Sequence, residues 1–221
     1  MLRFSLVEIG TGGRASCARC GLSRQAVDYL SAAEVTEHIR RAVAECPSPG
    51  PNVMLGGADA FGHPELPVLV NAATRDGAVR IGLETDGGAL ATSGNAAGAL
   101  HAGVRHVRVS YADPPKALAG ISAWAEAART AGVAAVATAA VSLCVHNVTE
   151  LAQGVAAMAE AGVAGVTLDG RSMRVTADVR AQVAAACDTG TVNGVWVEVL
   201  GPAELLPESH VLHLVRDGEA R

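Results

Sequence analysis

Two cysteines three positions apart are the residues of this sequence best suited to chemistry. Cys17 and Cys20 form a Cys-x-x-Cys pair in the segment TGGRASCARCGLSRQ. This spacing lets two thiolates bind one tetrahedral metal ion or neighbouring irons of one iron–sulfur cluster. A metal centre needs three or four ligands, so the pair alone also allows a zinc site, a thiol redox couple or two unligated thiols.

The remaining cysteines differ in what they could contribute. Five cysteines in 221 residues are sparse and odd in number, which argues against a disulfide framework. Cys144 follows an apolar run and is the first candidate for a third metal ligand, although a free cysteine is more often a small buried side chain. His63 and His146 are weaker candidates. We interpret Cys46 and Cys187, near the ends of predicted helices, as packing residues.

The elements that must position these residues repeat along the chain as strand and helix. Apolar runs of strand length are each followed by glycines or polar residues and then by a stretch of helical period. The predicted strands are 2–9, 53–55, 80–84, 106–110, 133–141 and 165–168, with a seventh at 195–200 and an eighth at 211–215. Ser31 and Glu34 (a capping box), Pro64, Pro114-Pro115, Asn147/Thr149 and Thr176 mark the predicted helix starts.

Strands buried on both faces and alternating with helices predict an α/β fold with a parallel sheet. The spacing of the units favours a partial (β/α)6-type, TIM-like barrel over an open doubly wound sheet. No linker interrupts the pattern, so we expect residues 1–221 to form a single domain. In such a barrel the chemistry lies at the carboxyl ends of the strands. The Cys-x-x-Cys pair follows the first predicted strand, as this rule requires.

The order of several short segments resembles the radical S-adenosylmethionine (radical SAM) family over nearly the whole chain. Members commonly carry C-N-L-R-C-x-x-C-G after the first strand, G-G-E-P-L-x-H-P-E-L after the second, L-x-T-N-G after the third and a Ser-Leu-Asp type ending on the fourth. The matching segments are Gly13 to Gly21 with Cys17 and Cys20, Gly56-Gly57-Ala58-Asp59 with His63-Pro64-Glu65-Leu66, Leu83-Glu84-Thr85-Asp86-Gly87, and Val109-Ser110-Tyr111.

The resemblance implies a radical SAM core, a [4Fe-4S] cluster and S-adenosylmethionine (SAM) as cofactors. In the family three thiolates hold three irons, SAM chelates the fourth, and an electron cleaves SAM to methionine and a 5′-deoxyadenosyl radical. By position, the cluster ligands would be Cys17, Cys20 and a third residue, for which Cys144 is the candidate. The SAM contacts would come from Gly56, Gly57, Asp59, Ser110 and Ser142, with the adenine near Asp169-Gly170.

Two departures from the family pattern leave the function open. Gly13 stands where the first cluster cysteine is expected, and Ala58-Asp59 replace Glu-Pro. One hypothesis is an enzyme that still assembles a cluster and acts on a small molecule or a peptide. The other is a degenerate barrel without a cluster that serves as a partner or substrate-binding protein of an intact enzyme. An ordinary barrel enzyme or a zinc protein is the third alternative.

Composition narrows the range of partners. Sixteen Arg and the single Lys116 are outnumbered by 22 acidic residues, so the net charge is −5 and no basic footprint for nucleic acid is expected. The longest apolar run, 131–145, is too short to span a bilayer, and the amino-terminal segment lacks the pattern of a secretion signal. We therefore expect a cytoplasmic protein without a membrane segment.

Overall fold

Seven parallel strands form the main sheet of the protein. The computed structural model describes residues 4–11, 27–46 and 51–205. The strands are β1 (Phe4–Glu8), β2 (Gly10–Thr11), β3 (Asp28–Tyr29), β4 (Asn52–Gly56), β5 (Arg80–Thr85), β6 (Val104–Ser110), β7 (Val136–Ser142), β8 (Gly165–Asp169) and β9 (Trp196–Leu200). The helices are α1 (Ala32–Ala44), α2 (Leu66–Arg75), α3 (Asn95–His101), α4 (Pro114–Ala131), α5 (Leu151–Glu160) and α6 (Ala177–Val192), with short 3-10 turns η2 (Ala60–Gly62), η3 (Val148–Glu150) and η4 (Ala203–Leu205).

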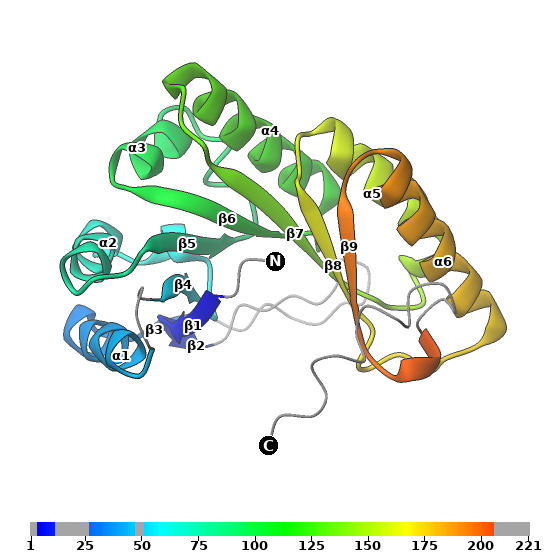
Figure 1. The fold of residues 1–221 in the computed structure, drawn as a ribbon, viewed down its shortest axis with the longest axis horizontal. Helices are drawn as coiled ribbons and strands as arrows, with labels where there is room; N and C mark the ends of the chain where they lie inside the picture. The colour runs from blue at the N-terminus through cyan, green and yellow to red at the C-terminus, as the bar shows by residue number, and fades with distance from the viewer. Residues whose placement is uncertain (1–3, 12–26, 47–50, 206–221) are drawn as a thin grey trace.

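The sheet is an open half-barrel. Its order is β1-β4-β5-β6-β7-β8-β9, every neighbouring pair is parallel, and β2 and β3 form a separate antiparallel pair. The six helices lie along the convex side of the curved sheet (Figure 1). Among the described residues β1 and β9 do not pair with each other, so the sheet does not close. The predicted α/β class and partial barrel of six βα units are confirmed, with β9 as the seventh strand; the eighth predicted strand lies outside the described residues.

Local sequence explains three of the six helix starts in the described residues. Ser31 caps α1 in a reciprocal capping box with Glu34, and the Thr176 side chain caps α6 by accepting from the Val179 N–H. Pro114 and Pro115 occupy the first turn of α4, where a missing N–H costs no hydrogen bond. α2 begins at Leu66, two residues later than the Pro64 start predicts, because Pro64 belongs to a turn after η2.

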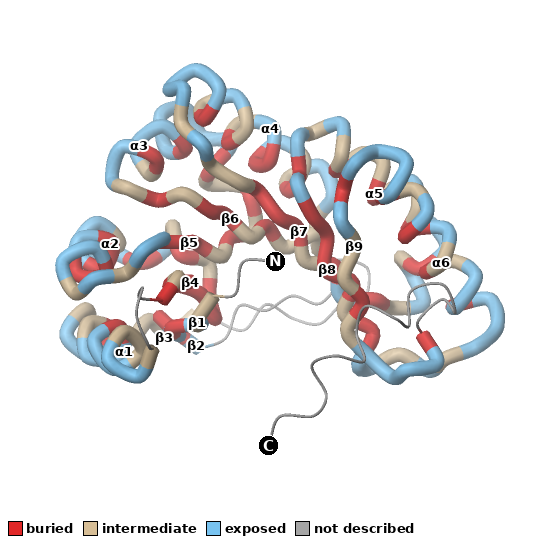
Figure 2. The backbone as a smooth tube through the Cα atoms, in the orientation of Figure 1, coloured by how far each residue is buried: buried red, intermediate tan, exposed pale blue. Residues whose placement is uncertain are grey.

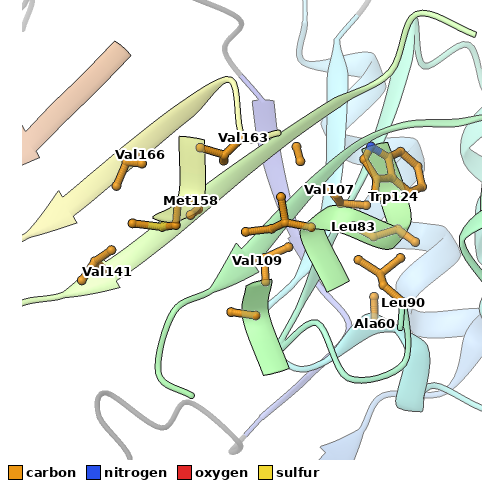
Figure 3. Packing of buried hydrophobic residues seen from close by; sticks show 14 of the residues in the cluster. Ala60, Leu83, Leu90, Val107, Val109, Trp124, Val141, Met158, Val163 and Val166 are labelled. Carbon is orange, nitrogen blue, oxygen red and sulfur yellow. The ribbon is translucent and has the colours of Figure 1, made fainter. Parts of the chain in front are cut away.

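The two faces of the sheet have different environments. Residues on the convex face pack against the helices in one apolar core (Figures 2 and 3). Trp124 of α4, only 1% exposed, lies beside Leu83 and Val107 in this core.

Within the described residues, no helix is long and apolar enough to cross a membrane.

The concave face carries polar and partly exposed residues. Because side chains alternate along a strand, Glu84 of β5 and Arg108 of β6 point to the face opposite Leu83 and Val107. At the amino-terminal part of this face, Phe4 and Met54 occupy the space above Gly82, and the Phe4 ring contacts His106 with centroids 4.7 Å apart. The concave face is therefore lined by apolar side chains near the amino ends of the strands and by polar side chains at their carboxyl ends.

Candidate functional site

The paired glycines after β4 form a tight turn whose two residues are glycine for different reasons. Gly57 has φ +87°, a conformation that other residues rarely adopt. A Cβ on Gly56 would instead lie 2.2 Å from Oε2 of Glu84, so a side chain there is excluded by that carboxylate. The Gly56 carbonyl accepts a hydrogen bond from the Ile9 N–H at 2.9 Å. The turn is thus held from both neighbouring strands.

Glu84 and Arg108 form the charged pair beside this turn. They are direct register partners on β5 and β6, with Arg108 Nη1 3.4 Å from Glu84 Oε1. The other oxygen of Glu84 accepts from the Gly57 N–H at 2.9 Å. Glu8, at the end of β1, lies close to Gly57 on the other side, since a Cβ there would be 3.3 Å from Glu8 Cγ. The glycine turn therefore lies between two glutamates.

Asp59 uses its carboxylate to organise the loop that follows the turn. Its Oδ1 accepts from the Phe61 N–H at 3.0 Å, which caps η2. Its Oδ2 accepts from the Asp86 N–H at 3.2 Å and from the Thr85 hydroxyl at 3.3 Å. The Tyr29 hydroxyl donates to the Asp59 carbonyl at 2.8 Å. Asp59 thus joins the ends of β3, β4 and β5.

The pKa values of Asp59 and Asp86 are shifted in opposite directions. Burial raises the pKa of Asp59, and the nearby Asp86 carboxylate adds to the effect. Burial acts on Asp86 as well, but its contacts with the Lys116 ammonium and the Gly88 N–H lower the pKa of Asp86. Burial, followed by the charges of Asp59 and Asp86, raises the pKa of Tyr29. Of the two carboxyls, Asp59 is the one that takes up a proton first.

The predicted SAM-binding residues all lie at the carboxyl edge of the sheet. Ser110 ends β6 and Ser142 ends β7, and the register places both on the concave face. Ser142 also pairs with Asp169 of β8, whose carboxylate is bound by Arg171 in two contacts of 2.9 and 2.6 Å. Three strand spacings, about 14 Å along the sheet, separate Gly56 from Ser142. An elongated ligand could reach both.

The predicted metal ligands are only partly placed. Gly13, Cys17 and Cys20 lie outside the described residues. Cys144 is half-buried in the loop after β7, where its N–H donates to the Asn147 side chain at 2.8 Å. Within the described part of the chain no three His, Cys, Asp or Glu residues gather as a metal site. The cluster ligands remain a prediction.

His63 and Cys187 have structural roles. His63 is 4% exposed, accepts from the Glu65 N–H at 3.1 Å through Nδ1 and lies 3.0 Å from the Leu30 carbonyl through Nε2. It therefore supports the start of α2, in accord with a capping role. Burial, followed by the charge of Asp188, raises the pKa of Cys187 to about 11, so this thiol is unreactive at neutral pH.

A pocket of about 350 Å³ lies on the helix side of this edge, between α4 and α5 and the loops that follow β6 and β7, and His146 is among its lining residues. Leu118 and Met158 supply apolar surface, while Tyr111 and Glu150 supply polar groups. Burial, followed by the charge of Glu150, raises the pKa of Tyr111. Asp59, Glu84 and Arg108 do not line this pocket, so we place the candidate site on the concave side of the carboxyl edge.

Sequence reasoning missed Glu84, Arg108, Tyr29 and Lys116 as parts of this site. Glu84 and Arg108 did carry a signal, because each is a charged residue next to the buried apolar residues of its strand. Their pairing required the register, which places them opposite each other. Tyr29 and Lys116 come from segments distant in sequence, and nothing in the sequence indicates that they meet Asp59 and Asp86.

The fold and the site define an open (β/α) half-barrel with its polar residues at the carboxyl edge. No family model matches the chain, and no curated protein is significantly similar in sequence. Among solved structures, SuiB from Streptococcus suis bound to S-adenosylmethionine is similar with a TM-score of 0.62 and 12% identity, over 91% of this chain and 51% of SuiB.

SuiB bound to its precursor peptide SuiA is equally similar, with a TM-score of 0.62 and 12% identity, over 90% of this chain and 49% of SuiB. A proposed phosphonomutase from Burkholderia cenocepacia J2315 gives a TM-score of 0.51 and 19% identity, over 76% of this chain and 82% of that one. The chain thus spans about half the length of SuiB. The likeness to SuiB, a radical SAM enzyme, shows a radical SAM-like fold, and neither likeness extends further than the fold.

Proposed function

We propose that this protein binds S-adenosylmethionine at the carboxyl edge of the half-barrel, as a divergent radical SAM-like protein. The observation that carries the proposal is the carboxylate-lined glycine turn. Glu84 accepts the Gly57 N–H, and Glu8 lies on the other side of the turn. Such a turn suits a cationic ligand, and SAM carries both an ammonium and a sulfonium. The similarity to SuiB, whose solved structure contains SAM, supports the same assignment.

The electrostatics of the turn disfavour a phosphate ligand. A glycine turn that binds phosphate offers its backbone N–H groups to the anion. Here the Gly57 N–H is already bound by a carboxylate, and the nearby cations Arg108 and Lys116 are paired with Glu84 and Asp86. A phosphorylated or phosphonate ligand would meet negative charge at this position.

A cluster would be held by Cys17, Cys20 and a third ligand, for which Cys144 is our candidate. When bound, a [4Fe-4S] cluster supplies the electron that cleaves SAM. Cys144 lies two residues beyond Ser142, at the same edge as the glycine turn. The replacement of the first cysteine by Gly13 favours one alternative, a SAM-binding barrel without a cluster that serves as a non-catalytic partner or substrate-binding protein of an intact enzyme.

The concave face is the proposed place for a substrate or partner. Leu6 of β1 and Trp196 of β9 are 45% and 41% exposed on this face, which combines apolar surface with the polar edge. We propose a small-molecule or peptide substrate; SuiB has been solved with a precursor peptide bound.

Anaerobic reconstitution with iron and sulfide separates these functions. The measurements are iron content, the visible charge-transfer spectrum, electron paramagnetic resonance with and without SAM, and SAM affinity by equilibrium dialysis. A cluster whose signal changes on SAM addition supports the enzyme. SAM binding without a cluster supports the non-catalytic barrel, and absence of both overturns the proposal.

Cysteine variants test the ligand set. Cys17→Ala should abolish the cluster, and Cys144→Ala should lower its iron content and alter its spectrum. Cys46→Ala is the matched control, because Cys46 follows α1 at the opposite edge of the sheet. An unchanged spectrum in Cys144→Ala, together with loss in Cys17→Ala, would remove Cys144 from the ligand set while leaving the cluster in place.

A further inference from the structure

Glu84 has a position that fits a role in shaping the glycine turn. It lies on the concave face of β5, and its Oε2 accepts the Gly57 N–H at 2.9 Å. Arg108, its register partner on β6, holds the other carboxylate oxygen. The side chain is therefore anchored at both oxygens and cannot rotate away without losing a contact.

The peptide between Gly56 and Gly57 is fixed at both of its polar ends. Its carbonyl accepts from the Ile9 N–H, and its N–H donates to Glu84. The carboxylate occupies the space that a Cβ at position 56 would fill, 2.2 Å from Oε2. Gly56 does not have a positive φ, so the glycine there provides room for Glu84. The two positions form one structural unit.

A fixed peptide at this point determines what the turn can offer a ligand. The N–H that a glycine turn would normally donate is unavailable, because Glu84 holds it behind the turn. The next peptide, between Gly57 and Ala58, is the first that can face a ligand, and the positive φ of Gly57 sets its direction. This arrangement favours a ligand that donates hydrogen bonds and needs an acceptor from the turn.

We propose that Glu84 is a positioning residue that orients the Gly56-Gly57 turn for ligand binding. The inference rests on the proposed function in one respect, namely that the ligand bound by this turn is SAM. Independently of the ligand's identity, the carboxylate of Glu84 keeps the Gly57 N–H in a hydrogen bond.

Two measurements on one set of variants test the proposal. The variants are Glu84→Ala, which removes the acceptor, and Glu84→Gln, which keeps an amide oxygen as acceptor. Glu37→Ala, on the exposed face of α1, is the matched control for loss of a carboxylate. Circular dichroism confirms that each variant is folded. Amide hydrogen exchange of 15N-glycine-labelled protein follows Gly57, and equilibrium dialysis gives the SAM dissociation constant.

Glu84→Ala loses one hydrogen bond to a charged acceptor. It should therefore raise the amide exchange rate of Gly57 about tenfold and raise the SAM dissociation constant about tenfold. Glu84→Gln should keep Gly57 exchange within about threefold of the wild type, because its amide oxygen replaces the acceptor, whereas its SAM binding also loses the carboxylate charge. If Glu84→Ala does not fold, Gly56→Ala serves instead, since its Cβ displaces the carboxylate. Gly98→Ala, with no atom within 4 Å of the added Cβ, is its control.

The outcomes separate the two proposals. Normal SAM binding in the wild type, with both readouts unchanged in Glu84→Ala, overturns the role of Glu84 and leaves the proposed function intact. Absence of SAM binding in the wild type overturns the proposed function; faster Gly57 exchange in Glu84→Ala then still supports the positioning of the turn. Gly57 exchange that is equally fast in Glu84→Gln and Glu84→Ala contradicts positioning through the hydrogen bond.

Discussion

Asp59 follows Ala58, the residue that stands where the radical SAM pattern has a glutamate, and the structure gives the Asp59 carboxylate three hydrogen bonds within the protein. The donors are the Phe61 N–H, the Asp86 N–H and the Thr85 hydroxyl. A carboxylate used in this way supports the loop first, and any contact with a ligand comes in addition. Its role as a SAM contact stays a prediction, and its structural role can be measured separately.

Replacement of Asp59 by Ala should lower the free energy of unfolding by about 2 kcal/mol, because partly buried donors lose their acceptor. Asp59→Asn should cost less, since one amide oxygen still accepts. Urea denaturation measures both, with Asp188→Ala as the control for an exposed carboxylate on α6. Equal stability of Asp59→Ala and the wild type would mean that the loop finds other partners.

His106 is the buried titratable group of the concave face. It is 7% exposed, and its Nε2 lies 2.9 Å from the Thr138 hydroxyl, while Nδ1 has no partner. Burial, then the charges of Arg108 and Arg80, lower the pKa of His106 from 6.5 to about 4. The folded protein therefore holds this imidazole neutral at a pH where the unfolded chain would protonate it.

The contribution of neutral His106 to the free energy of unfolding should be fully present above pH 6.5 and should fall as the pH drops toward 4. In that range only the unfolded state takes up the proton. The full loss is about 3 kcal/mol. Urea denaturation between pH 7 and 4.5 should show a smaller loss for His106→Gln than for the wild type. A His106 imidazole resonance that titrates near pH 6.5 in the folded protein would contradict the lowered pKa of this residue.

At the scale of elements, most helices and strands were predictable because their signals are local. The capping box of α1, the paired prolines of α4 and Thr176 of α6 each act within one turn of the helix that they start. α3 was missed because Gly94, in a left-handed conformation, precedes it without a side-chain cap, and the helix itself is only seven residues long. The β2 and β3 pairing was missed because it joins two-residue strands distant in sequence.

The candidate site was predictable only in outline. Gly56, Gly57, Ser110 and Ser142 follow apolar strands, and parallel strands bring their carboxyl ends to one edge. The hydrogen bonds of Asp59 depend instead on loop geometry, which has no periodic signal in the sequence. The relation between Glu84 and Gly56 depends on register, which a single sequence does not contain.

The contact between α4 and the loop after β5 predicts an effect of opposite sign for two helical glycines. A Cβ on Gly120 would lie 2.4 Å from the Gly87 carbonyl oxygen, so Gly120→Ala should destabilise by about 1 to 3 kcal/mol despite better helix propensity. Gly98→Ala on α3 meets nothing within 4 Å and should stabilise by up to about 1 kcal/mol. Urea midpoints give both values, and a stabilising Gly120→Ala would contradict the close approach.

At the scale of the molecule, the open half-barrel places its two tryptophans in different layers. Trp124 lies in the core between sheet and helices, whereas Trp196 lies on the concave face over Gly165. Acrylamide should therefore quench Trp196 and leave Trp124 largely unaffected. Trp196→Phe should remove the quenchable part of the emission. Quenching that survives in this variant would contradict the burial of Trp124, and wild-type emission that acrylamide does not quench would contradict an accessible concave face.

The space shared by Gly56 and Glu84 has a consequence for how the sequence can change over evolutionary time. A side chain gained at position 56 while glutamate remains at 84 creates a collision, so the order of substitutions matters: position 84 must shorten first. The same reasoning applies to Gly165, where a Cβ would lie 1.9 Å from the Trp196 ring. Related sequences should therefore show each of these pairs changing together.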